Sequence, residues 1–158
     1  MEVWELVARE SIRDRIARWN ANGDAGRFSE MVLVLAPDVE FQAADSPVLH
    51  GRDAVLAFLG GVGGAGDDGT PTALPAGRYV PPGGRPSIRH YTSTVQIDLT
   101  SETTARVRSY YVVLSSSGLD HWGRYLDEFG VIDGDWLITR RTVTTEGVDP
   151  EGWAAVHA

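Results

Sequence analysis

Five polar residues in the second half of the chain could carry acid–base chemistry: His90, Tyr111, Tyr125, Asp127 and Arg141. A neutral imidazole titrates near physiological pH and is suited to taking a proton from a substrate. A phenol can donate a hydrogen bond to a developing enolate, and a guanidinium can pair with the same charge. A carboxylate between apolar neighbours is desolvated, which makes it a candidate acid or base. Gathered in one pocket, these groups would suit proton transfer on a small molecule.

The elements that must position these residues are four long strand-like runs, at 87–99, 104–116, 119–132 and 135–147. Each is longer than the usual strand of about five or six residues, so the sheet must curl strongly. Short turns link the runs, which predicts an antiparallel meander. Because side chains alternate along a strand, residues 88, 90, 92 and 94 are expected on one face, and each of the adjacent pairs Tyr110/Tyr111 and Arg140/Arg141 is split between faces.

The first third of the chain reads as helical. Apolar spacing predicts helices at 4–22 and 25–35, a short strand at 38–43 and a third helix at 54–59, with Gly23 and Pro37 as stops. Helices followed by strands predict an α+β fold, in which the helices cover the concave face of the sheet and enclose a conical space. We expect a single domain over 1–158. The Gly- and Pro-rich stretch 60–86 is either a lid over the mouth of the cone or a surface insertion without a role.

The composition excludes several classes of function. The formal net charge of −8 argues against nucleic acid and against anionic membranes as partners. The chain has no cysteine, so thiolate chemistry is excluded. His50, His121 and His157 lack the spacing of a metal site, and no metal is expected. No run of about 18 apolar residues and no secretory leader are evident, which predicts a cytoplasmic protein.

Five segments, in this order and at compatible spacing, carry a resemblance to a known family. They are IRDRIARWNANGDAGRFSEM, APDVEF, LHGRDAVLAFL, SIRHYTSTVQIDL and GRYLDEFGVIDGDWLITRR. The chain resembles the SnoaL-like branch of the nuclear-transport-factor-2-like superfamily, and within it scytalone dehydratase and hexachlorocyclohexane dehydrochlorinase. The resemblance implies a cone-shaped α+β barrel and a pocket that needs no cofactor. It also implies proton transfer on a small hydrophobic substrate and assembly as a homodimer or homotrimer.

The resemblance also assigns roles to individual residues. His90 takes the place of the pocket histidine that abstracts the proton, and Arg141 takes that of the pocket arginine. Tyr111 lies near the position of a second polar pocket group, so we expect it to stabilise an enolate together with Arg141. Trp19, Asn20, Tyr125 and Trp122 are expected to contact the substrate.

One family residue is not carried over by this comparison. The aspartate that orients the histidine in the two lyases falls on Ala21, between Asn20 and Asn22. We therefore expect Asn20 or Asp127 to orient His90. Asp127 could instead face outward and pair with an arginine of the neighbouring strand, Arg106 or Arg108.

Three functions follow from these expectations. The first is a cofactor-independent lyase, cyclase or isomerase. The second is a binding or dimerisation module that uses the same pocket without catalysis. The third is an epoxide-hydrolase-like enzyme, which would need two carboxylates and an arginine around one water molecule.

Overall fold

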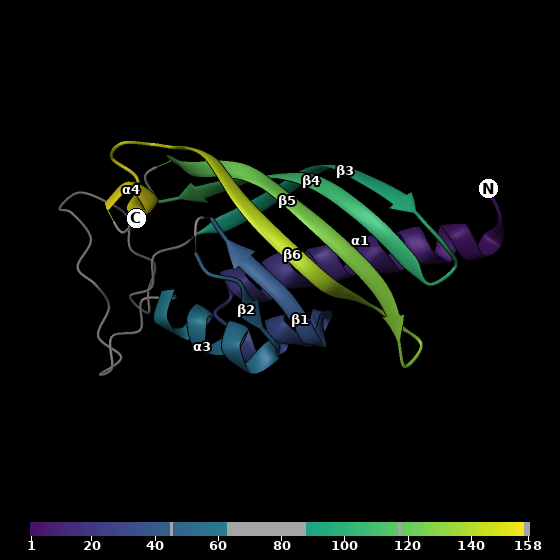
Figure 1. Ribbon diagram of the computed structural model, residues 1–158. Coiled ribbons are helices and arrows are strands. Elements are labelled where there is room, and N and C mark those ends of the chain that lie inside the picture. The colour runs from purple at the N-terminus through teal and green to yellow at the C-terminus, as the bar shows by residue number, and fades with distance from the viewer. Residues whose placement is uncertain (45, 63–87, 117, 157–158) are drawn as a thin grey trace.

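A computed structural model describes residues 1–44, 46–62, 88–116 and 118–156 of the chain (Figure 1). The segment 63–87 lies outside the described residues, and with it nearly all of the stretch expected to be a lid or a surface insertion.

The helices and strands follow the order expected from the sequence. In chain order they are α1 (Val3–Asp24), α2 (Phe28–Met31), the 3-10 helix η1 (Val32–Val34), β1 (Leu35–Ala43), β2 (Leu49–His50), α3 (Arg52–Val62), β3 (Arg89–Leu99), β4 (Thr104–Ser115), β5 (Gly118–Ile132), β6 (Asp135–Val148) and α4 (Trp153–Val156). The sequence did not predict β2 or α4. It predicted one helix over 25–35, where the chain forms two short helical turns and then enters β1 at Leu35.

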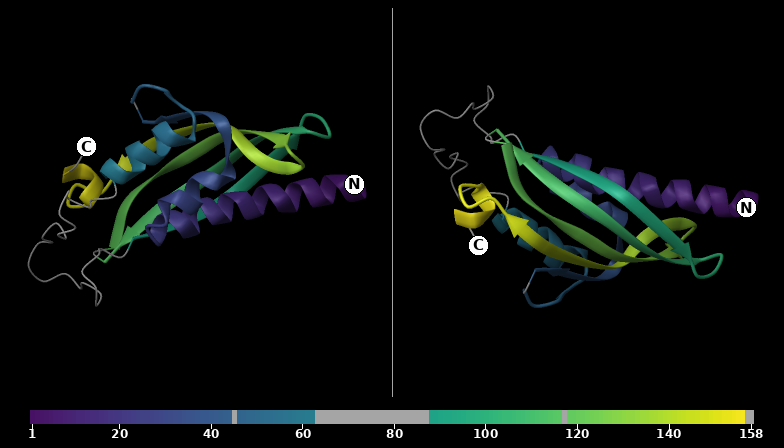
Figure 2. Two further views of the ribbon diagram at one scale, coloured as in Figure 1. Left: turned by 90° about the horizontal axis from the view of Figure 1, so that it is seen from below. Right: turned by 90° about the horizontal axis from the view of Figure 1, so that it is seen from above.

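The strands form one curved sheet in the order β2-β1-β6-β5-β4-β3. The four long strands β3 to β6 pair as an antiparallel meander, as predicted. The sheet as a whole is mixed, because β1 pairs in parallel with β6, with Phe41 opposite Arg141. Figures 1 and 2 show α1 and α3 on the concave side of this sheet. The α+β cone is therefore confirmed, with a parallel pair that the hairpin pattern could not reveal.

Helix α1 carries one half of the site described below. It begins with a capping box between Glu2 and Glu5 and buries its inner face against the sheet. The sequence placed the end of this helix at Gly23, but the helix continues through Asp24. The glycine that ends it is Gly26, which adopts a positive φ of 69° after the last helical turn. Extending α1 to this point places Asp24 beside the first residues of β3.

Strand β3 carries the other half. Its pairing with β4 shifts register between Ser93 and Gln96, and Thr94 adopts a positive φ of 51°. This bulge reverses the alternation of faces: His90 and Thr92 are partly buried before it, and Ile97 is buried after it. The predicted inward orientation is therefore right for residues 88, 90 and 92 and wrong for Thr94.

Close packing of β5 against β6 depends on Gly123. A Cβ atom at this position would lie 1.9 Å from the carbonyl oxygen of Thr144, a backbone atom that cannot swing away. We expect Gly123→Ala to lower the free energy of unfolding by about 2–3 kcal/mol, because the two strands would have to separate. Gly60 is the matched control, since a Cβ there meets nothing within 4 Å. Gly60→Ala should leave stability unchanged or raise it slightly. Urea denaturation of both variants would measure the difference, and equal stabilities would contradict this account.

Candidate functional site

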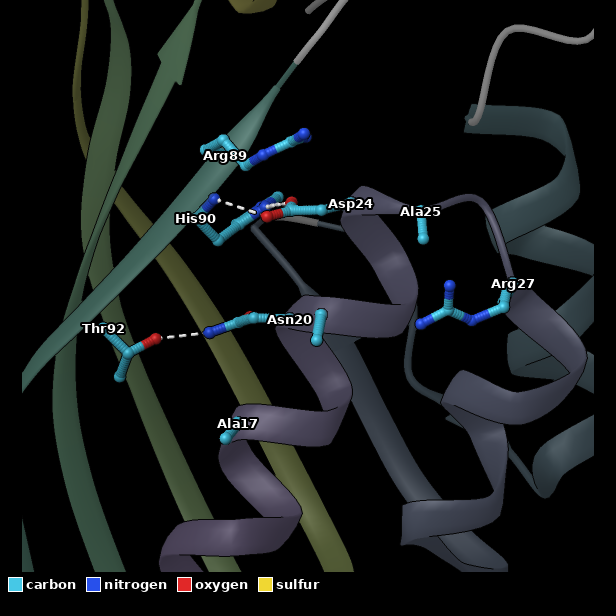
Figure 3. A pocket seen from close by; sticks show the side chains of 9 residues that line it. Ala17, Asn20, Asp24, Ala25, Arg27, Arg89, His90 and Thr92 are labelled. Atoms are coloured by element: carbon cyan, nitrogen blue, oxygen red, sulfur yellow. Dashed lines mark hydrogen bonds and ion pairs between the residues drawn. The ribbon is translucent and has the colours of Figure 1, made fainter.

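The site is a groove between the C-terminal half of α1 and the beginning of β3. Its volume is ≈ 570 Å³. Figure 3 shows the side chains that border it, which come from α1, the turn after it and β3. They are Ala17, Asn20, Ala21, Asp24, Ala25, Arg27, Arg89, His90 and Thr92. We expected an enclosed conical space that takes a small hydrophobic substrate. This groove is instead open, and its larger side chains are polar.

At the centre of the groove, Asp24 holds His90 through both carboxylate oxygens. Oδ1 lies 2.6 Å from the ring Nδ1, and Oδ2 accepts the backbone N–H of His90 at 3.0 Å. The side chains of His90 and Asp24 are 22% and 12% exposed. A carboxylate on Nδ1 fixes the orientation of the ring and stabilises the imidazolium that forms when the other nitrogen takes a proton. Nε2 is then the nitrogen available to a bound molecule.

The structure corrects our assignment of the orienting residue. A carboxylate does hold His90, and it is Asp24, three residues beyond Ala21 and on the same side of α1. Ala21 borders the same groove, but its methyl side chain cannot form a hydrogen bond with the histidine. The error came from ending the helix at Gly23. Asp24, which directly follows the glycine that we took as the end of the helix, is the residue that orients His90.

Asn20, our first alternative for orienting His90, has other partners. Its Nδ2 donates a short hydrogen bond to Oγ1 of Thr92, and its Oδ1 accepts one from the hydroxyl of Tyr125 at 3.4 Å. Asn20 is buried and borders the groove, so it connects the groove to the buried layer beneath. Thr92, which the sequence analysis did not single out, borders the groove beside it.

Beneath the groove lies a buried ion pair between Arg141 and Asp127. Nε and Nη2 of Arg141 donate to the two oxygens of Asp127, each at 2.7 Å, and neither side chain is exposed to solvent. The guanidinium carbon lies 4.8 Å from the ring centre of Trp19 and 4.5 Å from that of Tyr125. Burial lowers the pKa of Arg141, but the charge and hydrogen bonds of Asp127 outweigh this effect, and the pKa is raised.

Asp127 therefore faces inward, but it orients Arg141 and not His90, and it pairs with neither Arg106 nor Arg108. Neither member of the ion pair borders the groove, although we expected Arg141 to meet an enolate there. Nη1 of Arg141 is buried without a hydrogen-bond partner among the described residues. The guanidinium thus keeps unused donor capacity under the groove.

Tyr111 and Tyr125 stack on each other beside this ion pair. Their ring centres are 4.7 Å apart, and both side chains are buried. The hydroxyl of Tyr111 contacts Oγ1 of Thr145 at 3.1 Å, so it is bound to β6. Burial raises the pKa of both phenols above the ordinary value, which keeps them neutral hydrogen-bond donors.

Two of the tryptophans expected at the pocket lie in different environments. Trp19 is buried under α1 against Arg141 and Phe41. Trp122 lies on the outer face of the sheet, where its ring covers Gly147 and is 38% exposed. The expected contact between Trp122 and the substrate is therefore wrong, because the residue belongs to the opposite face of β5 from Tyr125.

Sequence reasoning missed two arginines at the groove. Figure 3 shows Arg89, from β3, and Arg27, from the turn after α1, extending toward the space around Asp24. Arg27 also bonds to Asn22 and Glu30. The only feature of the sequence that pointed to Arg89 as a groove residue was its position directly before His90. Arg27 is paired with Glu30 at 3.1 Å, so the groove carries charges of both signs, from Asp24 and the two arginines.

Among the described residues, no three His, Asp or Glu side chains are grouped closely enough to hold a metal ion. None of the described helices combines the length and the hydropathy needed to cross a bilayer.

The fold and the site can now be compared with known proteins. The sequence profile of the SnoaL-like domain matches residues 4–142, so the chain belongs to the SnoaL-like family. No curated protein matches the chain.

Three solved structures illustrate the likeness in fold. A candidate scytalone dehydratase from Novosphingobium aromaticivorans is 23% identical, with a TM-score of 0.72 over 94% of this chain and 91% of the other. LinA is 14% identical, with a TM-score of 0.71 over 92% and 90%. Aln2 from a Streptomyces species is 16% identical, with a TM-score of 0.69 over 88% and 91%. At these identities the comparison supports the cystatin-like, NTF2-like fold and not a particular reaction.

Proposed function

We propose that the protein is a cofactor-independent enzyme of the lyase, cyclase or isomerase type, acting by proton transfer on a small, largely hydrophobic organic molecule. The observation that carries this proposal is the contact of 2.6 Å between Asp24 and the Nδ1 atom of His90 at the wall of a groove. A histidine oriented by a carboxylate on Nδ1, with no hydrogen bond to Nε2 from the described residues, has the geometry of a general base.

In this proposal Nε2 of His90 removes a proton from a carbon next to a carbonyl group. The electron pair of the C–H bond moves toward the carbonyl oxygen and forms an enolate. Asp24 stabilises the imidazolium that results. The negative charge of the enolate lies in a groove that also holds Arg27 and Arg89, and their guanidinium groups favour the charged intermediate.

The buried residues act through the floor of the groove. Arg141 holds the rings of Trp19 and Tyr125, and Tyr125 donates to Asn20. We expect Arg141, Asp127 and Tyr111 to position Tyr125 and, through it, Asn20. This role replaces the direct contact with an enolate that the sequence suggested for Arg141 and Tyr111.

A screen in deuterated water tests the proposal. Cyclic β-hydroxy ketones report loss of water, and β,γ-unsaturated ketones report isomerisation; mass spectrometry follows both the products and the uptake of deuterium. Asp24→Asn should lower turnover about 100-fold, because an amide donates to Nδ1 and moves the ring proton to the wrong nitrogen. Asp14→Asn is the control, since it makes the same change on the same helix at an exposed carboxylate that pairs with Arg18 and does not border the groove. Equal turnover of Asp24→Asn and the wild type would exclude the proposed base.

The two other functions lose support. The binding module was favoured by the absence of an acid beside His90, and Asp24 supplies that acid. The epoxide-hydrolase-like site needs two carboxylates around an arginine, and among the described residues Arg141 meets only Asp127. The proton-transfer enzyme is the function we retain.

Assembly and location remain predictions. The outer face of the sheet exposes several apolar side chains, which supports a homodimer or homotrimer. They include Tyr91, Tyr110, Leu114, Leu119, Trp122 and Leu126. A cytoplasmic location is expected from the sequence.

A further inference from the structure

The first residue of β3, Arg89, reaches the groove round the edge of the sheet. Arg89 and His90 are neighbours in the strand, so their side chains leave the backbone on opposite faces. Both nevertheless border the groove, and Figure 3 shows Arg89 extending toward the space around Asp24. Because β3 is the last strand of the described sheet, no strand blocks that side, and a long outward-facing side chain can bend round the free edge.

The guanidinium of Arg89 is held at this edge, but most of its hydrogen-bonding capacity is unused. Its Nη1 atom donates to the carbonyl oxygen of Ile88 at 2.6 Å. Within the described part of the chain, no carboxylate forms an ion pair with it. A guanidinium has five N–H donors and no acceptor, so the remaining donors can bind only an electron-rich group. The residue is exposed, so a molecule in the groove can reach them.

The other charged side chains that border the groove already have partners. Both oxygens of Asp24 are bonded to His90, one through the ring and one through the backbone. Arg27 pairs with Glu30 at 3.1 Å. Arg89 is therefore the charged group of the groove that keeps its pairing capacity for a ligand, and a guanidinium pairs best with an anion.

We propose that Arg89 determines the substrate specificity of the groove by binding a carboxylate of the substrate. The substrate is then a keto acid, whose hydrocarbon frame carries a ketone, next to the carbon that loses a proton, and a separate carboxylate. This inference rests on the proposed function of His90. A guanidinium and a carboxylate form two parallel hydrogen bonds in one plane, which orients the bound molecule. A carboxylate suits the groove better than a phosphate, because Asp24 at its centre repels a second negative charge.

Exchange of hydrogen for deuterium reports this specificity. In deuterated water the C–H bond next to the ketone breaks, its proton moves to Nε2 of His90, and the electron pair forms the enolate. The histidine exchanges this proton with solvent, and the enolate carbon takes a deuteron. The ketone is recovered with deuterium in place of hydrogen, so the step needs no other reactant.

The competing explanation is that Arg89 is a solvated surface side chain without a ligand. Two probes separate the explanations: 4-oxocyclohexanecarboxylate, a keto acid, and 4-oxocyclohexanecarboxamide, the matching keto amide. They share the ring, the ketone and a planar substituent of similar size, and they differ in charge. An arginine that binds a carboxylate favours the keto acid, whereas a solvated arginine does not distinguish the two.

The experiment measures kcat/KM for deuterium uptake by mass spectrometry, corrected for exchange in buffer alone. We expect the wild type to favour the keto acid over the keto amide about 10-fold. Arg89→Gln should reduce this preference to less than about 2-fold, mainly by raising KM for the keto acid. The ratio of the two probes cancels any effect of Arg89 on the enolate, because both probes form the same enolate.

Arg108→Gln is the matched control. It removes the same charge from an exposed position on β4 that does not border the groove, so the wild-type preference should persist. Salt gives a second readout: raising sodium chloride from about 0.05 to about 0.5 M should narrow the preference of the wild type, because salt screens an exposed ion pair.

Two outcomes would overturn the inference. Equal rates for the two probes in the wild type would show that the groove does not select an anion, and a preference that persists in Arg89→Gln would assign the selection to another group. Failure of the proposed function looks different: the wild type would then exchange neither probe faster than His90→Gln does. Calorimetric titration decides the inference in that case. The keto acid should still bind the wild type about 10-fold more tightly than it binds Arg89→Gln, and equal affinities would exclude the carboxylate site.

Discussion

Replacing His90 by glutamine is expected to lower turnover of the substrate about 10³–10⁴-fold. Glutamine keeps a polar side chain of similar length and can still bond to Asp24, but it cannot accept a proton from carbon. The loss corresponds to removal of a general base together with the carboxylate that acts through it. Steady-state kinetics on any substrate found in the screen would measure it.

The control for this variant is His50→Gln. His50 lies on β2, is exposed, and belongs to a different part of the surface. Its replacement should leave turnover within about 2-fold of the wild type. If His90→Gln behaves like His50→Gln, His90 is not the base.

The second large effect is a loss of stability, expected when the buried ion pair between Arg141 and Asp127 is broken. Arg141→Met should lower the free energy of unfolding by about 3–5 kcal/mol, because it leaves the carboxylate of Asp127 buried without a partner. Methionine retains much of the volume between the rings of Trp19 and Tyr125, so the loss reports the charge and not a cavity. Urea denaturation followed by tryptophan fluorescence would give the value.

The neighbouring arginine supplies a matched control. Arg140 pairs with Glu40 on the outer face, where the two side chains are 53% and 39% exposed. Arg140→Met should therefore cost only about 0–1 kcal/mol, since water screens an exposed pair. Equal losses for Arg140→Met and Arg141→Met would contradict the burial of the inner pair.

A double replacement separates the charge from the fold. Arg141→Met combined with Asp127→Leu removes both charges and leaves an apolar pair of similar volume. Stability should recover most of the loss, because an apolar pair avoids the desolvation of two ions. Catalysis should not recover, because the guanidinium that holds the rings of Trp19 and Tyr125 in place is gone, and this contrast tests the role proposed for Arg141.

Much of the fold was predictable from local pattern. The four long strands were evident because each alternates over more than ten residues, and their order followed from the short turns between them. The parallel pairing of β1 with β6 was not, because it joins residues about 100 positions apart, such as Phe41 and Arg141. Strand sequences alone do not encode such long-range pairing.

The site was predicted in part, and its errors have local causes. His90 was singled out correctly as a groove residue, because the alternation before the bulge at Thr94 is regular. Asp24 was missed because the predicted helix ended two residues too early, before a glycine that the helix tolerates. Asp127 was one of two candidates for orienting His90. Strand alternation predicts which face a side chain lies on but not which partner it meets, and Asp127 pairs with Arg141.

The central claim is that the contact with Asp24 fixes the tautomer of His90, with a proton on Nδ1 toward the carboxylate and the lone pair on Nε2. Nitrogen-15 NMR of the ligand-free protein, labelled in its histidines, reads this tautomer directly and needs no substrate. We expect His90 to show a protonated Nδ1 in a strong hydrogen bond and an unprotonated Nε2, with the pattern reversed in Asp24→Asn. A proton found on Nε2 in the wild type would contradict the account, because the nitrogen facing the groove could then accept nothing.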